Sequence, residues 1–203
     1  MILTSPLLSE LDWLEHGFGT RHSALSQQAM SSLKQIHSAA VVSAETPGCV
    51  GEGDALVTSR AGLSVSIRTA DCYPILLADT RQKLVAAVHA GWRGTAARIT
   101  AAAVGHMKSQ PADLRVAIGP GIGACCYEVG AEVAHQFGYA AAGKIDLAVA
   151  NRTQLIALGV RPEKIDSVTG CTLCTLDDGQ PRFHSFRRDR KQAGRMISYI
   201  RIR

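Results

Sequence analysis

Residues 84–95, Leu84-Val85-Ala86-Ala87-Val88-His89-Ala90-Gly91-Trp92-Arg93-Gly94-Thr95, set the architecture of this chain. The five apolar residues 84–88 predict a strand that is buried on both faces. A polar histidine then ends the strand and a glycine turn follows. Beyond the turn, an apolar stripe at helical spacing predicts a helix that reaches about Lys108. The segment thus predicts a buried strand that leads through a turn into a covering helix.

Shorter segments on both sides of this strand predict the rest of the fold. Residues 63–69 alternate between apolar and polar side chains, which is typical of a half-buried strand. Residues 1–30 show no clear period. Because strands and helices mix without a strict βαβ alternation, we predict an α+β fold with mixed sheets in a single domain, residues 1–203. Further strands are predicted at 39–42, 54–58, 75–78, 116–118, 165–169, 182–186 and 197–202, and helices at 128–137 and 147–158.

Composition limits the partners of the chain. Its 203 residues are 46% hydrophobic and carry a formal net charge of +5, which suits anionic ligands such as phosphate. The basic residues are scattered, so no nucleic-acid partner is expected, and the dense run 187–191 is interpreted as a solvated surface. No stretch of eighteen apolar residues and no signal peptide are visible, which predicts no membrane partner and a cytoplasmic location. The oligomeric state is not predicted.

The six cysteines are interpreted with that location in mind. Cytoplasmic thiols stay reduced, so packing, metal binding or catalysis come before disulfides. Cys171 and Cys174 form a C-x-x-C pair, but no second such pair exists to complete a four-cysteine zinc site. We therefore expect Cys49, Cys125, Cys126 and Cys174 not to be ligands.

Three polar residues stand at strand ends or sharp turns, where sites are usually built. These are His37, Cys72 and His89. Two imidazoles and one thiolate can hold zinc and leave a fourth position free for water or substrate, as catalytic zinc requires. The intervals of 35 and 17 residues form no compact motif, and the alternative interpretation is a buried cysteine and two unrelated polar histidines.

Four further features accompany these residues. Arg93 and the glycine turn at the start of a helix predict an anion site, or else a turn with a surface ion pair. The glycine-rich loop 119–123 offers a second, weaker backbone cradle. Asp54 and Asp71 are candidates for orienting a ligand, binding substrate or transferring a proton, although turn capping by aspartate is equally common.

At these same residues the chain resembles the YfiH family, also called the laccase-like or multicopper polyphenol oxidase domain family. The motifs are specific and run in order over about residues 33 to 203. They include Gln35-Ile36-His37, Gly53-Asp54-Ala55-Leu56-Val57-Thr58, Thr69-Ala70-Asp71-Cys72, Val88-His89-Ala90-Gly91-Trp92-Arg93-Gly94-Thr95, Cys126-Tyr127-Glu128-Val129-Gly130 and Ser185-Phe186-Arg187-Arg188-Asp189.

The resemblance implies packed mixed sheets with helices outside, and zinc held by His37, Cys72 and His89. It also implies phosphorolysis of adenosine, inosine and S-methyl-5′-thioadenosine, with adenosine deaminase activity as well. Two departures bear on substrate preference. Only thirteen residues separate Gly17-Phe18-Gly19-Thr20-Arg21 from the Gln35 motif, which predicts a missing part of the pocket wall. Tyr73 stands where a smaller aliphatic residue is common.

Other functions remain open at this point. A copper-dependent, laccase-like oxidase would use Cu²⁺ with the same two histidines and cysteine, but seven histidines without an H-x-H pair are few for several coppers. A metal-independent cysteine hydrolase would use Cys72 as nucleophile and His89 as base. A binding protein with a structural metal would turn over no nucleoside. From the residues and the resemblance, we predict a zinc-dependent enzyme of purine nucleosides and phosphate, with His37, Cys72, His89 and Arg93 in the catalytic site.

Overall fold

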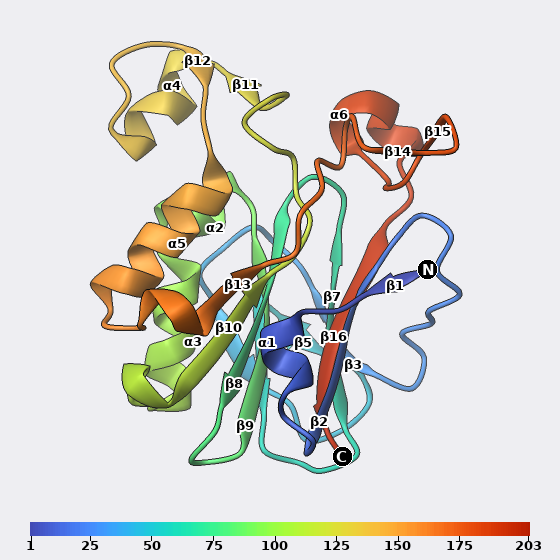
Figure 1. The fold of residues 1–203 in the computed structure, drawn as a ribbon, viewed down its shortest axis with the longest axis vertical. Coiled ribbons are helices and arrows are strands. Elements are labelled where there is room, and N and C mark those ends of the chain that lie inside the picture. The colour runs from blue at the N-terminus through green and yellow to red at the C-terminus, as the bar shows by residue number, and fades with distance from the viewer.

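The computed structural model describes residues 1–203 as two six-stranded sheets with helices on one outer side (Figure 1). The first sheet has the order β1 (Ile2–Leu3), β2 (Leu14–Gly19), β16 (Met196–Ile202), β7 (Ser64–Thr69), β3 (Ser31–Lys34) and β5 (Gly48–Glu52). The second has the order β13 (Ile165–Ser167), β10 (Leu114–Ile118), β8 (Tyr73–Asp79), β9 (Leu84–Ala90), β6 (Ala55–Thr58) and β4 (Val41–Ser43). Both contain parallel and antiparallel pairs, which confirms the α+β fold with mixed sheets.

Helices and two small hairpins complete the chain. In Figure 1, α2 (Trp92–Ala96), α3 (Ile99–Met107) and α5 (Leu147–Ala157) lie together on the outer face of the second sheet. No helix combines the length and the apolar character that crossing a membrane requires. The remaining elements are α1 (Pro6–Ser9), α4 (Ala131–Ala134), α6 (Phe186–Asp189), and the hairpins β11 (Glu128–Val129) with β12 (Gly143–Lys144) and β14 (Leu176–Asp177) with β15 (Gln180–Pro181).

The central strand β9 is buried on both faces, as its apolar run predicts. Side chains alternate across a strand, so neighbouring residues enter different cores. Ala86 and Val88 enter the core under the helices, whereas Val85 and Ala87 enter the core between the two sheets. His89 follows Val85 and Ala87 in this alternation. Its side chain therefore lies on the face of β9 that is directed toward the first sheet.

Several sequence expectations agree with the structure and others are wrong. The strands predicted at 54–58, 63–69, 84–88 and 197–202 are confirmed as β6, β7, β9 and β16. The helix expected to run unbroken to Lys108 is divided, because Arg98 adopts a left-handed conformation (φ 58°) between α2 and α3.

Three more segments differ from expectation. The segment 1–30 contains β2, whose backbone pairs with β16 although its sequence has no clean alternation. The predicted helix 128–137 begins as strand β11 and becomes helical only from Ala131. Residues 182–186 form no strand and lead instead into α6. The extent of the domain, residues 1–203, stays a prediction.

We expect Phe18→Ala to destabilise the fold strongly. Phe18 lies on β2, is fully buried between the sheets and packs so closely on Gly119 that a Cβ added there would lie 2.2 Å from its ring. Loss of a buried phenyl ring leaves a cavity, which costs about 3–5 kcal/mol of unfolding free energy. Denaturant unfolding would measure this. Tyr139→Ala, at a tyrosine that is 45% exposed, should change the same quantity by less than about 0.5 kcal/mol.

Candidate metal centre and its pocket

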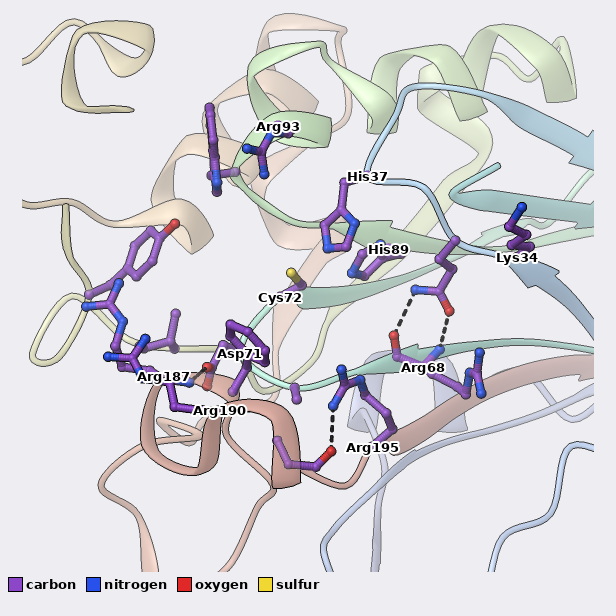
Figure 2. A pocket seen from close by; sticks show the side chains of 17 residues that line it. Lys34, His37, Arg68, Asp71, Cys72, His89, Arg93, Arg187, Arg190 and Arg195 are labelled. Atoms are coloured by element: carbon purple, nitrogen blue, oxygen red, sulfur yellow. Dashed lines mark hydrogen bonds between the residues drawn. The ribbon is translucent and has the colours of Figure 1, made fainter. Parts of the chain in front are cut away.

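Two histidines and one cysteine converge at one end of the second sheet. The ligand atoms of His37, Cys72 and His89 all lie within 4.8 Å of one another. The two imidazole rings meet edge to face with their centroids 4.9 Å apart. In Figure 2 the three side chains point toward one another at the floor of the pocket. We call this group the His–Cys–His cluster.

Strand register brings the cluster together. Pro74 of β8 pairs with His89 of β9. Cys72, the residue just before β8 begins and two before Pro74, therefore lies on the same face of the sheet as His89. Ala55 of β6 pairs with Val88, which places Asp54 next to His89 on the other side. His37 comes from the loop between β3 and β4 and has a positive φ of 59°, a strained conformation that is common at functional sites.

Asp54 orients both histidines from beneath. One carboxylate oxygen, Oδ1, accepts hydrogen bonds from the His89 ring Nδ1 at 2.8 Å and from the His37 backbone N–H at 3.0 Å. The other, Oδ2, accepts from the N–H of Ile36 at 3.3 Å and from the N–H and hydroxyl of Ser38 at 2.6 and 2.8 Å. Because Nδ1 of His89 is engaged, its Nε2 is the nitrogen left for a metal.

Electrostatics favour a cation in the cluster. Burial alone would raise the pKa of Cys72, but hydrogen bonds with His37 and His89 lower it to about 7. Burial would lower the pKa of His89, whereas Asp54 and Cys72 raise it to about 9. Burial would raise the pKa of Asp54, but the hydrogen bonds from His89 and Ser38 bring it to about 2. Cys72 and Asp54 are thus held toward their charged forms and His89 toward its protonated form, and a metal cation would replace that proton.

The donor set and the space around it fit zinc. Two imidazole nitrogens and one thiolate, with a carboxylate behind one histidine, are typical of a catalytic zinc site with an open position. Gly91 leaves this space free, because a Cβ there would lie 2.8 Å from the Cys72 sulfur and 3.5 Å from the His37 ring. The same three donors are also those of a single blue-copper site.

A cavity of about 730 Å³ opens over the cluster, and its wall is strongly cationic. Asp71 is the one acidic side chain of the lining, against six basic ones. Figure 2 shows these basic side chains around the His–Cys–His cluster. They are Lys34, Arg68, Arg93, Arg187, Arg190 and Arg195. Aromatic side chains of Trp92, Tyr127 and Phe186 supply apolar surface in the same cavity.

Some of the backbone N–H groups predicted to hold an anion bond to carbonyl groups of the chain instead. The helix after the glycine turn, α2, has only five residues, and the N–H of Thr95 is used by the carbonyl of Gly91. In the loop 119–123, the N–H groups of Gly119 and Ile122 are also used, by the carbonyls of Pro74 and Asp71. These three N–H groups are therefore not available to an anion.

Arg93 does line the pocket, as predicted. Its guanidinium stacks 4.3 Å from the centre of the Trp92 ring and takes part in none of the seven ion pairs of the chain. An exposed guanidinium held by stacking remains available to an anionic ligand. The interpretation of Arg93 as one half of a surface ion pair is therefore wrong.

The two predicted aspartates have different positions. Asp54 has no exposed surface and does not line the cavity, so a direct contact with substrate is excluded in this conformation. Asp71 lines the cavity, but its carboxylate accepts hydrogen bonds from the Thr172 hydroxyl at 2.7 Å and the Arg187 backbone N–H at 2.6 Å. Asp71 thus ties the C-terminal segment to the strand end that carries Cys72.

Sequence reasoning missed most of the cationic wall. The run 187–191, interpreted above as solvated surface, places Arg187 and Arg190 in the pocket lining. Arg187 also lies 5.4 Å from the centre of the Tyr127 ring and donates to the Glu128 carbonyl at 2.9 Å. The match of this segment to the family motif was the one signal that could have drawn attention to it.

The chain is similar to known proteins in both sequence and fold. The family described as multi-copper polyphenol oxidoreductase laccase matches residues 18–203. A purine nucleoside phosphorylase of Deinococcus radiodurans is 40% identical over 181 residues, which cover 83% of this chain and 68% of the relative. Adenosine deaminase RL5, from an unknown prokaryotic organism, is 40% identical over 164 residues, and the chain covers 61% of its length. The crystal structure of YlmD from Geobacillus stearothermophilus has a TM-score of 0.86 at 27% identity, covering 98% of this chain and 94% of that one.

The family match over residues 18–203 spans most of the chain and decides its family. The chain belongs to the multi-copper polyphenol oxidoreductase laccase family, in its YfiH-like form.

Proposed function

We propose that this protein is a zinc-dependent purine nucleoside phosphorylase. Adenosine, inosine and S-methyl-5′-thioadenosine would each react with phosphate to give the free base and the pentose 1-phosphate. One observation carries the proposal: six basic side chains surround the His–Cys–His cluster within a single cavity. Phosphorolysis needs an anion held beside the nucleoside, and such a wall supplies the charge that holds it.

Each part of the pocket has a separate task in this proposal. His37, Cys72 and His89 would hold zinc, which supplies a Lewis acid that polarises an oxygen or nitrogen of the substrate. Arg93, with Arg187 and Arg190, binds phosphate and neutralises its charge. The faces of Tyr127 and Phe186 pack against the purine, and Asp54 keeps both histidines oriented. We place the protein in the cytoplasm, where Cys72 stays reduced.

Adenosine deaminase activity is proposed as a second reaction of the same site. It needs water attack at the purine C6 rather than phosphate. The name of the RL5 relative supports this reaction. An assay with adenosine, with and without phosphate, separates the two: adenine requires phosphate, whereas inosine does not. If a zinc-loaded protein forms neither adenine nor inosine from adenosine, and no hypoxanthine from inosine and phosphate, the proposed function is wrong.

Arg93→Ala should weaken phosphorolysis selectively. Loss of a charged hydrogen-bond donor to phosphate costs about 1.5–3 kcal/mol, so the KM for phosphate should rise roughly 10- to 100-fold. Deamination of adenosine, which uses no phosphate, should change by less than about 3-fold. Steady-state kinetics at varied phosphate would measure both. As a control, Arg161→Ala removes an exposed arginine paired with Glu163 outside the pocket and should leave both reactions unchanged. Equal losses in the two reactions would contradict a phosphate role for Arg93.

The geometry also supports a metal-independent cysteine hydrolase as a second candidate. Asp54, His89 and Cys72 follow one another in the order of a catalytic triad, with the carboxylate 2.8 Å from the ring nitrogen. Such an enzyme would keep its activity after treatment with a chelator and lose it on alkylation of Cys72. The zinc enzyme would instead lose activity with the chelator and regain it when zinc is returned.

A copper-dependent, laccase-like oxidase has less support. Several coppers need many histidine ligands, and the structure brings only His37 and His89 into a cluster. His16 and His106 instead form hydrogen bonds with Ser5 and Ser43. A blue colour in the copper-loaded protein, with oxidation of a phenol, would favour the oxidase.

A further inference from the structure

Four of the six cysteines gather in a second cluster, outside the His–Cys–His cluster. The sulfur atoms of Cys125, Cys126, Cys171 and Cys174 all lie within 4.8 Å of one another. The Sγ atoms of Cys125 and Cys174 are 3.7 Å apart. The expectation that no four-cysteine site forms rested on the lack of a second C-x-x-C pair. The structure nevertheless brings four cysteines together, because a turn at residues 124–126 places the adjacent Cys125 and Cys126 next to Cys171 and Cys174.

We propose that this four-cysteine cluster is a structural zinc site. In a tetrahedral site with Zn–S bonds of about 2.3 Å, neighbouring sulfurs lie roughly 3.8 Å apart. The Cys125–Cys174 pair, at 3.7 Å, already has about this separation, and the other sulfur pairs, all within 4.8 Å, need only small shifts. Four thiolates are the donor set of a closed, structural zinc site, which leaves no position for substrate. Binding releases the four thiol protons, so zinc replaces protons in the cluster.

The surrounding backbone supports thiolates at this point. Gly123 donates its N–H to the Cys171 sulfur at 3.3 Å, and a Cβ at Gly123 would lie 3.2 Å from the Cys125 sulfur. Backbone N–H groups that point at sulfur stabilise its charged form. Arg188 holds the opposite loop, donating to the carbonyls of Thr172 and Leu173 at 3.4 and 3.2 Å.

The position of the cluster indicates what the metal would do. It would join the loop after β10, which carries Ile122 and Tyr127, to the segment around Thr172. Besides the contacts between sulfurs, an isolated β-bridge between Gly121 and Cys171 joins these two segments. In this bridge the Thr172 N–H donates a hydrogen bond to the Gly121 carbonyl. Thr172 in turn holds Asp71, beside Cys72. A zinc ion here would therefore brace one wall of the pocket without touching substrate.

Metal analysis of the protein purified under reducing conditions tests the proposal. We expect two zinc ions per wild-type chain, and one in the double variant Cys125→Ser/Cys174→Ser. Cys49→Ser, at an exposed cysteine outside both clusters, should retain two. A wild-type chain with one zinc, all of which is lost in Cys72→Ala, would overturn the proposal. So would a Cys125–Cys174 disulfide, found by mass spectrometry of protein kept reduced throughout.

Cobalt substitution keeps the test decisive if the double variant does not fold. Cys72→Ala lacks the His–Cys–His cluster but retains all four cysteines. Loaded with cobalt(II), it should show the thiolate charge-transfer and d–d bands of a tetrahedral tetrathiolate complex. Absence of these bands in folded Cys72→Ala would overturn the proposal. Neither readout depends on turnover, so failure of the proposed enzymatic function would leave this result standing.

Discussion

Cys72→Ala is expected to lower kcat/KM for adenosine phosphorolysis by on the order of 10³-fold or more, because the metal loses its one anionic ligand. One zinc ion per chain should be lost in parallel. Cys72 is half-buried at the floor of the cavity, and its sulfur lies beside both imidazoles. Alanine leaves two neutral nitrogens, which bind zinc far more weakly than a set that contains a thiolate. Metal analysis and product formation would be measured on the same preparation.

Controls must separate loss of metal from loss of a nucleophile. Cys49→Ala should keep full activity and zinc, since this exposed cysteine belongs to neither cluster. Wild-type protein stripped of metal should be as inactive as Cys72→Ala, and zinc should restore only the wild type. If stripped wild-type protein remains active while Cys72→Ala is inactive, the cysteine acts as a nucleophile and the zinc proposal is wrong.

The sequence identified the three residues of the His–Cys–His cluster more readily than it predicted that their side chains lie close together in the fold. Each of the three residues lies at a strand end or in a loop, which the apolar runs made visible. The intervals of 35 and 17 residues carry no information about register. Convergence depends on the pairing of β6, β8 and β9, which only the folded sheet defines. The family resemblance supplied the ligand set before that pairing was known.

The pocket wall was much less predictable. Its basic side chains come from separate segments: Lys34 at the end of β3, Arg68 on β7, Arg93 on α2, and three arginines near α6. Such residues follow no periodic pattern, and an arginine on a loop looks the same whether it faces bulk water or a cavity. The net charge of +5 indicated an anionic ligand but not its location.

Local geometry explains the other failures. β2 contains two glycines and a buried histidine, so its sequence lacks apolar alternation, yet its central position between β1 and β16 is fixed by backbone pairing. Arg98 interrupts the helix through a left-handed conformation that no propensity favours for arginine. Adjacent cysteines point to opposite sides of a strand, but the turn at Cys125 and Cys126 brings them to the same side. In each case tertiary contacts overrode the local signal.

These differences share one consequence for the site. The strands that hold Cys72 and His89 are strongly specified by buried apolar residues, so the cluster is rigid where catalysis needs precision. The basic wall is carried mainly by loops and short helices, which tolerate changes in length and sequence.

Asp54→Asn should weaken zinc binding about 10- to 100-fold, as loss of a carboxylate behind a metal-bound histidine typically does. Every partner of this buried carboxylate is a donor. In asparagine an NH₂ group replaces one of the two carboxylate oxygens. Each oxygen accepts at least two hydrogen bonds in the wild type, so the NH₂ group faces two or more N–H or O–H donors in either orientation. Each donor left without an acceptor costs about 1–3 kcal/mol, so unfolding free energy should fall as well. Zinc affinity by competition with a chelating dye, together with thermal unfolding, would measure both effects.

Asp79→Asn is the matched control for that variant. Asp79 is equally buried and accepts N–H groups of Arg81 and Gln82 at 2.9 and 2.8 Å, but it lies at the far end of β8, away from the His–Cys–His cluster. The same isosteric change there should lower stability and leave zinc affinity unchanged. If both variants change zinc affinity equally, the effect is a general loss of stability. If Asp54→Asn binds zinc like the wild type, Asp54 does not set the orientation of His37 and His89, and the proposed positioning role fails.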